Sequence, residues 1–390
     1  MNIIEVESSK TKKEFHHLPF VIYQNDKNWI PHLKQDVEAV FNPAKNKFFR
    51  YGEASRWILK DEQGELIGRI AAFIDQRRAK KEKQPTGGIG FFECMDDQIS
   101  ANLLFDTCRD WLRNRKMEAM DGPINFGDRD RYWGLLVDGY EKPPIYLNSY
   151  NPPHYRGLFE NYGFRTYFEQ YLYIRDLQEP AQLKFRKHAE QVSQDPAYCF
   201  RHILKKTWER YADDFCTIYN KAWASHSDYK KMSKEQARSA VRKLKPVLDE
   251  KLMWFGYYND EPIAFFIMLP EMNQIFRHIH GNLNLWGKLK FLYYKKKKIC
   301  TNAFGIAFGI IPEHQGKGVE GSLIMQAEKL FQHSKQGSKY QNIILTWIGD
   351  FNPKMMKVAK NLGTKTYQTL ITYRKLFDEN VLFERCPIVL

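Results

Sequence analysis

The sequence predicts an α/β protein of the α+β type, with two tandem domains that each carry a mixed, mostly antiparallel sheet flanked by helices. The chain has 390 residues, which is enough for two or three domains with sizeable cores. Hydrophobic residues make up 43% of it and aromatic residues 15%, and this composition argues against disorder. One order of elements occurs twice: a hairpin, a strand, a helix, a strand, a helix between Asn and Gly, and a closing strand.

In the first half, residues 20–49 are aromatic and contain Pro31 and Pro43, which indicates an irregular lead-in with short helices. Apolar alternation and helical spacing then give the regular elements. These are strands at 54–60 and 65–74 joined by a turn, a strand at 88–93, helices at 98–115 and 153–161, and a strand at 166–174.

The second half repeats this order after a basic, polar stretch. We expect a first domain at 1–175, a linker at 176–198 and a second domain at 199–390. The expected elements are a strand at 200–206, helices at 209–223 and 233–250, a hairpin of 252–258 with 262–269, strands at 303–311, 343–348 and 367–373, and a helix at 353–362.

A glycine-rich segment links the strand at 303–311 to the helix that follows it. Gly316, Gly318 and Gly321 lie between Pro312 and a helical repeat of apolar residues. Unpaired amides at a helix N-terminus bind phosphate, and glycines let the backbone approach it. The spacing fits neither a Walker loop nor a GxGxxG motif. The segment therefore predicts a seat for a pyrophosphate, with an ordinary glycine-rich turn as the alternative.

The segment resembles the acyl-CoA loop of the GNAT acyltransferase superfamily, whose pattern is Arg/Gln-x-x-Gly-x-Gly/Ala. Gln315 to Val319 fit this pattern, whereas Glu320 stands where the family has Gly or Ala. Asn352 and Gly363 also match the Asn and Gly that bound the last helix of GNAT domains. Ala359 replaces the Tyr that protonates the departing thiolate in many members.

The resemblance implies acetyl-CoA or another acyl-CoA as co-substrate. In GNAT proteins the strand before the loop offers its backbone to the pantetheine arm. The residues expected to bind the cofactor are Phe308, Gly309, Ile310, Ile311, Gln315, Gly316, Lys317, Gly318, Val319, Glu320, Gly321 and Asn352. Backbone donors aimed at the developing oxyanion would lower the barrier to direct attack by an amine.

We place the catalytic site at Asp350, Asn352 and Tyr367, near the expected thioester. Each has a plainer interpretation: a turn residue for Asp350, a helix N-cap for Asn352 and a core residue for Tyr367. Glu313 and His314 are expected to lie outside the cleft. No metal site is expected.

The first half has acids where the second has glycines. Asp96 and Asp97 would repel a pyrophosphate, so we assign them to helix capping and interpret the first domain as a degenerate copy. Tandem GNAT folds also occur in N-myristoyltransferases and Fem-type aminoacyl transferases. This chain resembles uncharacterised bacterial GNAT proteins of similar length more closely.

The net charge of +14 is spread along the chain, which favours a solvated surface over a nucleic-acid patch. No apolar run is long enough to span a bilayer and the first residues do not resemble a signal peptide, so we predict a cytoplasmic protein. The segment 271–298 is aromatic and basic. It suggests a pocket cover, a membrane-surface element or, our preferred interpretation, a packed helix with a solvated basic end.

The leading hypothesis is an acyl-CoA-dependent N-acyltransferase, most simply an N-acetyltransferase, that acts on a small-molecule or peptide amine. One alternative is a non-catalytic acyl-CoA-binding or scaffold protein, suggested by Glu320 and Ala359. The other is an aminoacyl-tRNA-dependent Fem-like transferase. The sequence predicts no oligomeric state.

Overall fold

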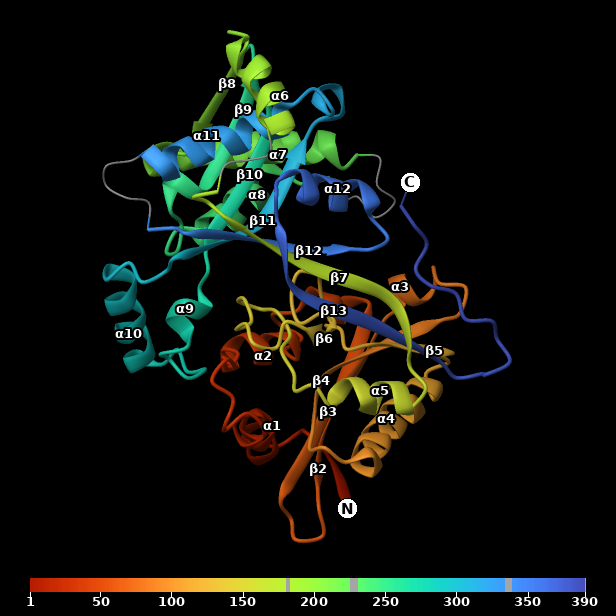
Figure 1. Ribbon diagram of the computed structural model, residues 1–390. Helices are drawn as coiled ribbons and strands as arrows, with labels where there is room; N and C mark the ends of the chain where they lie inside the picture. Colours follow the sequence, from red (N-terminus) through yellow and green to blue (C-terminus); the bar gives the residue numbers. More distant parts are fainter. Residues whose placement is uncertain (180–182, 225–230, 334–338, 390) are drawn as a thin grey trace.

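A single mixed sheet runs through both halves of the molecule (Figure 1). The computed structural model describes residues 1–179, 183–224, 231–333 and 339–389. Within these residues 13 strands pair in the order β1-β2-β3-β4-β5-β13-β7-β12-β11-β10-β9-β8, and β6 pairs with β13 at the side of this path. The strands of the first half are β1 (Asn2–Glu5), β2 (Gly52–Lys60), β3 (Leu66–Asp75), β4 (Thr86–Cys94), β5 (Ala119–Gly122), β6 (Leu135–Asp138) and β7 (Arg165–Asp176). Those of the second half are β8 (Tyr198–His202), β9 (Met253–Tyr258), β10 (Glu261–Pro270), β11 (Asn302–Ile310), β12 (Asn342–Gly349) and β13 (Lys365–Leu376).

Helices cover both faces of the sheet in each half (Figure 1). In the first half they are α1 (Ser9–Ile22), α2 (Lys34–Val40), η1 (Lys47–Arg50), α3 (Gln76–Ala79), α4 (Gln98–Arg113) and α5 (Tyr155–Asn161). In the second half they are α6 (Leu183–Gln194), η2 (Lys205–Thr207), α7 (Trp208–Ala222), α8 (Lys234–Leu244), η3 (Glu250–Leu252), α9 (Asn273–Phe276), α10 (Leu285–Lys296), η4 (Pro312–His314), α11 (Val319–His333) and α12 (Pro353–Asn361).

Two apolar clusters hold the first half together, one on each face of β2–β4. Phe15 of α1 and Val37 of α2 pack on one face, and Leu104 and Phe105 of α4 pack on the other. Most of α1 lies before residue 20, where no element was predicted from the sequence; the helix begins with a capping box at Ser8 and continues through Pro19.

The last strand of each half lies among strands of the other half. β13 pairs with β5 and β7, with Tyr373 opposite Gly122 and Leu370 opposite Gln170. β7 pairs with β12 on its other edge, with Ile174 opposite Ile344. The four central strands therefore alternate between the halves, in the order β5, β13, β7 and β12.

Buried charges join the exchanged strands. Arg374 of β13 donates two hydrogen bonds to Asp121 of β5, from Nε at 2.7 Å and from Nη2 at 3.0 Å. Arg78 donates to the same carboxylate at 2.7 Å, and Arg374 also contacts Glu82 at 3.2 Å. Burial of Asp121 and Arg374 removes solvent screening, so this paired geometry holds β13 in register against β5.

The segment predicted as a linker contains α6, which packs along α11. Ser322 of α11 donates its hydroxyl to the carbonyl of Ala189 in α6 at 2.8 Å. Arg175 and Glu328, both buried, form an ion pair at 2.5 Å beside this contact. The boundaries 1–175, 176–198 and 199–390 stay predictions, and the exchange of β7 and β13 means that neither half completes its sheet alone.

Glu271 joins the halves where β10 ends. Its carboxylate is buried and accepts the amides of Tyr146 at 2.8 Å, Asn273 at 3.0 Å and Gln274 at 3.2 Å. Tyr146 belongs to the first half and the other two residues to the second. Burial raises the pKa of the Glu271 carboxyl from an ordinary 4.5 to about 7, although the three amides oppose this shift.

This raised pKa predicts a loss of stability as the pH rises. The folded state holds the Glu271 proton more tightly than the unfolded state, so the contribution is present below about pH 4.5 and is lost towards pH 7. For the wild type we expect this group to lower the free energy of unfolding by about 2 to 3 kcal/mol between about pH 5 and pH 8. Urea unfolding of wild type and Glu271→Gln at both pH values isolates this contribution. Equal pH dependence in the two proteins would contradict it.

Candidate functional site

The strands β11 and β12 run parallel at first and then part. Their pairing extends from Asn302 opposite Asn342 to Gly305 opposite Leu345. On its other edge β11 stays paired with β10 as far as Ile310, with a bulge at Ile306. The edge of residues 306–310 that faces away from β10 therefore has no strand partner in the described part of the chain. Phe308, Gly309, Ile310 and Ile311 lie on this stretch, where the sequence places the pantetheine arm.

The glycine loop is open at its surface. Gly316 and Gly318 have φ values of +72° and +87°, which favour glycine over residues with a side chain. Gly316 and Lys317 are exposed, and no hydrogen bond to the described residues is found from the amides of Gly316, Lys317 or Gly318. Gln315 stabilises the turn, because its Nε2 donates to the carbonyl of Ile310 at 2.9 Å.

The helix α11 begins directly after these amides, at Val319. Its first turn adds further unpaired N–H groups and the positive end of the helix dipole. This arrangement has the donors that a phosphate needs. Glu320 is the exception, because it places a carboxylate in the first turn and its Oε2 is buried without a partner among the described residues. That charge stabilises the helix and competes with a bound anion.

His314 lies beside the loop but faces the first strands of the second half. Its Nδ1 is 3.0 Å from the hydroxyl of Tyr198, and burial together with Lys317 lowers the pKa of its imidazole. The ring is therefore neutral near pH 7 and packs against Tyr198 and Tyr258.

Asp350 and Asn352 follow β12, as predicted, and both make structural contacts. Asp350 forms an ion pair with Arg385 of the C-terminal segment, which also pairs with this turn through Val389 and Phe351. Asn352 caps α12, since its side chain accepts the amide of Met355 at 3.2 Å. Their catalytic roles stay predictions.

Tyr367 lies in β13, and its hydroxyl donates to the carbonyl of Pro143 at 2.8 Å. Its ring is buried with Leu136, Ile145 and Leu370. The Tyr367 side chain therefore packs β13 against β6 and the loop that follows β6. Burial raises the pKa of this phenol above its usual range. No hydrogen bond among the described residues connects Tyr367 with Asp350 or Asn352.

The first half has the same parting of strands, but its own chain fills the gap. β4 and β5 pair in parallel only from Thr86 to Gly88. Beyond this point the amide of Ile124 donates to the carbonyl of Ile89 at 2.7 Å, and a Cβ on Gly90 would lie 1.9 Å from the carbonyl oxygen of Ile124. Asp97 caps α4 by accepting the amides of Ile99 and Ser100, as the sequence predicts. This half therefore offers neither a slot for pantetheine nor a free loop for pyrophosphate.

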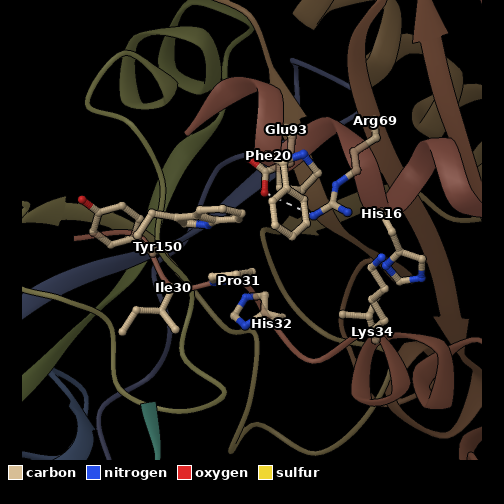
Figure 2. A pocket seen from close by; sticks show the side chains of 12 residues that line it. His16, Phe20, Ile30, Pro31, His32, Lys34, Arg69, Glu93 and Tyr150 are labelled. Atoms are coloured by element: carbon tan, nitrogen blue, oxygen red, sulfur yellow. Dashed lines mark hydrogen bonds and ion pairs between the residues drawn. The ribbon is translucent and has the colours of Figure 1, made fainter. Parts of the chain in front are cut away.

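A small pocket lined by both polar and apolar side chains lies at the end of β4 in the first half (Figure 2). It is lined by His16, Pro19, Phe20, Trp29, Ile30, Pro31, His32, Lys34, Val37, Arg69, Glu93 and Tyr150. An adjoining pocket shares His32, Arg69, Glu93 and Tyr150 with it. Burial lowers the pKa of His32 to about 4, so this imidazole is neutral at physiological pH.

Glu93 and Arg69 point toward one another in the wall of this pocket (Figure 2). Arg69 donates to Glu93 at 3.2 Å and to the carbonyl of Phe15 at 2.6 Å. The other carboxylate oxygen accepts hydroxyl groups of Tyr23 at 2.7 Å and Tyr155 at 2.8 Å. Burial raises the pKa of Glu93, and the three donors oppose that shift. Because all three donors hold the carboxylate, it fixes the shape of the pocket.

Sequence reasoning missed this network. Its one local sign is an acid, Glu93, at the end of the otherwise apolar strand at 88–93. The partners Tyr23, Arg69 and Tyr155 lie 24 to 70 positions away in the chain, so no local spacing could have grouped them.

We expect Glu93→Gln to lower the free energy of unfolding by about 3 kcal/mol, because it leaves the buried guanidinium of Arg69 without its counter-charge. Urea unfolding measures the change. The double variant Glu93→Gln, Arg69→Met is the matched control, and it should recover part of the loss because both charges are gone. A single variant as stable as the wild type would show that the pair does not hold the pocket.

Comparisons with known proteins extend over nearly the whole chain. No protein-family model matches it. It is 26% identical over 380 residues to the bacterial ceramide synthase of Caulobacter vibrioides (strain NA1000 / CB15N), covering 96% of this chain and 97% of the relative. It is 22% identical over 366 residues to protein YghO of Escherichia coli (strain K12), covering 93% and 92%.

Two solved structures have similar folds. A tandem GNAT protein from the clavulanic acid biosynthesis pathway aligns with a TM-score of 0.54 and 9% identity, covering 97% of this chain and 98% of that chain. The GCN5-related glucosamine N-acetyltransferase region of a fungal multi-domain GH3 β-N-acetylglucosaminidase aligns with a TM-score of 0.53 and 13% identity. This chain spans only 38% of the length of the fungal protein, and 96% of it is covered.

Proposed function

We propose, from the tandem GNAT fold that the chain shares with these two structures, that it is an acyl-CoA-dependent N-acyltransferase whose second half seats the acyl donor. One observation carries this proposal. β11 and β12 stop pairing beside a glycine loop in which the amides of Gly316, Lys317 and Gly318 have no hydrogen-bond partner among the described residues, and Gly316 and Lys317 are exposed. The first half has the same gap but fills it with Ile124, so one half alone suits the donor.

The residues of the second half have distinct parts in this proposal. The amides of Gly316 to Gly318, together with the first turn of α11, would hold the pyrophosphate. The unpaired backbone of residues 306–310 would hold the pantetheine arm and orient the thioester carbonyl. An acyl-CoA supplies an activated carbonyl with a thiolate leaving group.

The reaction is direct transfer. The amine nitrogen attacks the thioester carbonyl, a C–N bond forms, the C–S bond breaks and the nitrogen loses one proton, giving an amide and free CoA. A backbone donor near the carbonyl would stabilise the oxyanion. Asp350, expected in the catalytic site, is the first titratable side chain after β12, so we propose it as the base, with its ion pair to Arg385 as a competing contact.

The relatives support an amine as the acceptor. Ceramide is the amide of a long-chain amino alcohol, and N-acetylglucosamine is the amide of an amino sugar. Both products contain the N-acyl bond that the proposed transfer makes. The 26% identity to the ceramide synthase extends over 96% of the chain, so we favour a long-chain amino alcohol as acceptor and a long-chain acyl-CoA as donor.

A direct assay tests this proposal. The full chain is incubated with palmitoyl-CoA and sphinganine, and in parallel with acetyl-CoA and glucosamine. Free thiol and the amide product are then measured. We expect amide formation with the long-chain pair. Binding of acyl-CoA without release of CoA to any amine would support the alternative of a non-catalytic acyl-CoA-binding protein, which Glu320 favours. No binding of any acyl-CoA would overturn the proposal.

Lys317→Glu should weaken binding of CoA by about tenfold, because it adds an anion beside the free amides without changing a glycine with positive φ. Isothermal titration with CoA measures the affinity. Lys329→Glu is the matched control, since it makes the same charge change on the exposed surface of α11 away from its N-terminus. A similar loss in both variants would show that net charge, and not the loop, governs binding.

Glu320→Gln should tighten CoA binding by about threefold, because it removes a negative charge from the first turn of α11. The same titration measures this gain at low and high salt, and the gain should shrink as salt screens the charge. An unchanged dissociation constant would place the pyrophosphate away from this helix.

A further inference from the structure

The helix α10 carries an exposed apolar stripe. Leu285, Trp286, Leu289, Leu292 and Tyr293 are each between 49% and 73% exposed. Their spacing of one, four, seven and eight positions from Leu285 places them on one side of the helix. Figure 1 shows α9 and α10 at the edge of the molecule, beside the two halves and outside the sheet.

The opposite side of α10 attaches it to the protein. Phe291 stacks on Phe276 with ring centroids 6.1 Å apart, and Tyr294 stacks on His278 at 4.2 Å. Gly287 lies so close to the carbonyl of Asn282 that a Cβ would be 2.0 Å from the oxygen. The helix is therefore packed on one side, as expected, but its exposed apolar stripe departs from the expectation of a packed helix with only a solvated basic end. These contacts fix the rotation of α10, so the larger apolar set faces away from the protein.

Lysines lie on both sides of the stripe and at its end. Lys288, Lys290, Lys295, Lys296, Lys297 and Lys298 are all exposed. No Asp or Glu occurs in the chain between Glu271 and Glu313. The segment that contains α10 therefore carries basic side chains and no acidic ones, next to exposed Leu, Trp and Tyr side chains.

We propose that α10 docks on an anionic membrane surface, with its apolar stripe among the acyl chains and its lysines against the phosphate headgroups. A basic helix with Leu and Trp on one side lies in the plane of such an interface. Trp286 and Tyr293 suit the headgroup region, because their rings have both apolar and polar parts. Within the described ranges, no helix has the length and apolar content to cross a bilayer, so the contact is at the surface.

The positive charge of the lysines on α10 favours an anionic bilayer over a second copy of the chain as the binding partner. Two copies meeting through α10 would bring two acid-free, lysine-rich segments together, and like charges repel. An anionic bilayer offers the opposite sign to the lysines and an apolar layer to the stripe. The proposal rests on α10 alone and does not depend on the acyltransferase assignment.

Vesicle co-sedimentation of the full chain tests the proposal. We expect binding to vesicles with roughly 30% phosphatidylglycerol, at least tenfold weaker binding to pure phosphatidylcholine, and weaker binding as salt rises from about 0.1 to 0.5 M. Leu285→Ser with Leu292→Ser should reduce binding at least tenfold. Leu204→Ser with Leu382→Ser is the matched control, because these leucines are exposed elsewhere, and its binding should match that of the wild type.

A second pair tests the charge. Lys288→Gln with Lys290→Gln should reduce binding to the anionic vesicles several-fold, whereas Lys12→Gln with Lys13→Gln on α1 should not. Circular dichroism checks that all variants fold. Equal loss in the α10 and control pairs would overturn the proposal. So would concentration-dependent dimerisation, seen by light scattering, that disappears in the α10 leucine variant while the wild type binds no vesicles.

Discussion

The alternation of β5, β13, β7 and β12 is the constraint on which the rest of the structure depends. It places the last strand of the chain in the middle of the molecule, where Arg374 meets the buried carboxylate of Asp121. Burying these two charges costs solvation free energy. That cost is offset only in a geometry where the two charges pair and hydrogen-bond with each other. It therefore specifies one register for β13, and through β7 it also fixes the position of β12.

That central position determines how the two halves differ. Each half has two strands that pair in parallel, β4 with β5 and β11 with β12. In both pairs the pairing stops partway along the strands. In the first half the chain after β5 turns back and its Ile124 fills the gap, while the pocket around Glu93 is closed by α1 and the segment before α2. In the second half the corresponding stretch of β11, residues 306–310, does not pair with β12, and the glycine loop follows it. One scaffold thus offers two different features, a pocket in the first half and an unpaired strand edge in the second.

The sequence predicted the tandem fold because the order of strands and helices repeats and because local signals at Asp97, Asn352 and the glycine loop are strong. Asp97 and Asn352 cap helices at the expected places. It did not predict the strand exchange, since the pattern of β13 would suit a neighbour from either half. It also missed the Glu93 network, whose members come together only in the folded chain, and the rotation of α10, which the contacts of Phe291 and Tyr294 decide. The expected catalytic group stays a prediction, because Asp350, Asn352 and Tyr367 already have partners.

The position of β13 also has a consequence for folding during synthesis. Residues 365–376 are synthesised after β5 and β7, and until then these two strands have a vacant place between them. The first half therefore waits with open strand edges while the second half is being made, and such edges pair readily with other chains. Assembly of the central strands is a late, long-range event, which makes the finished fold slow to form compared with two independent domains in series.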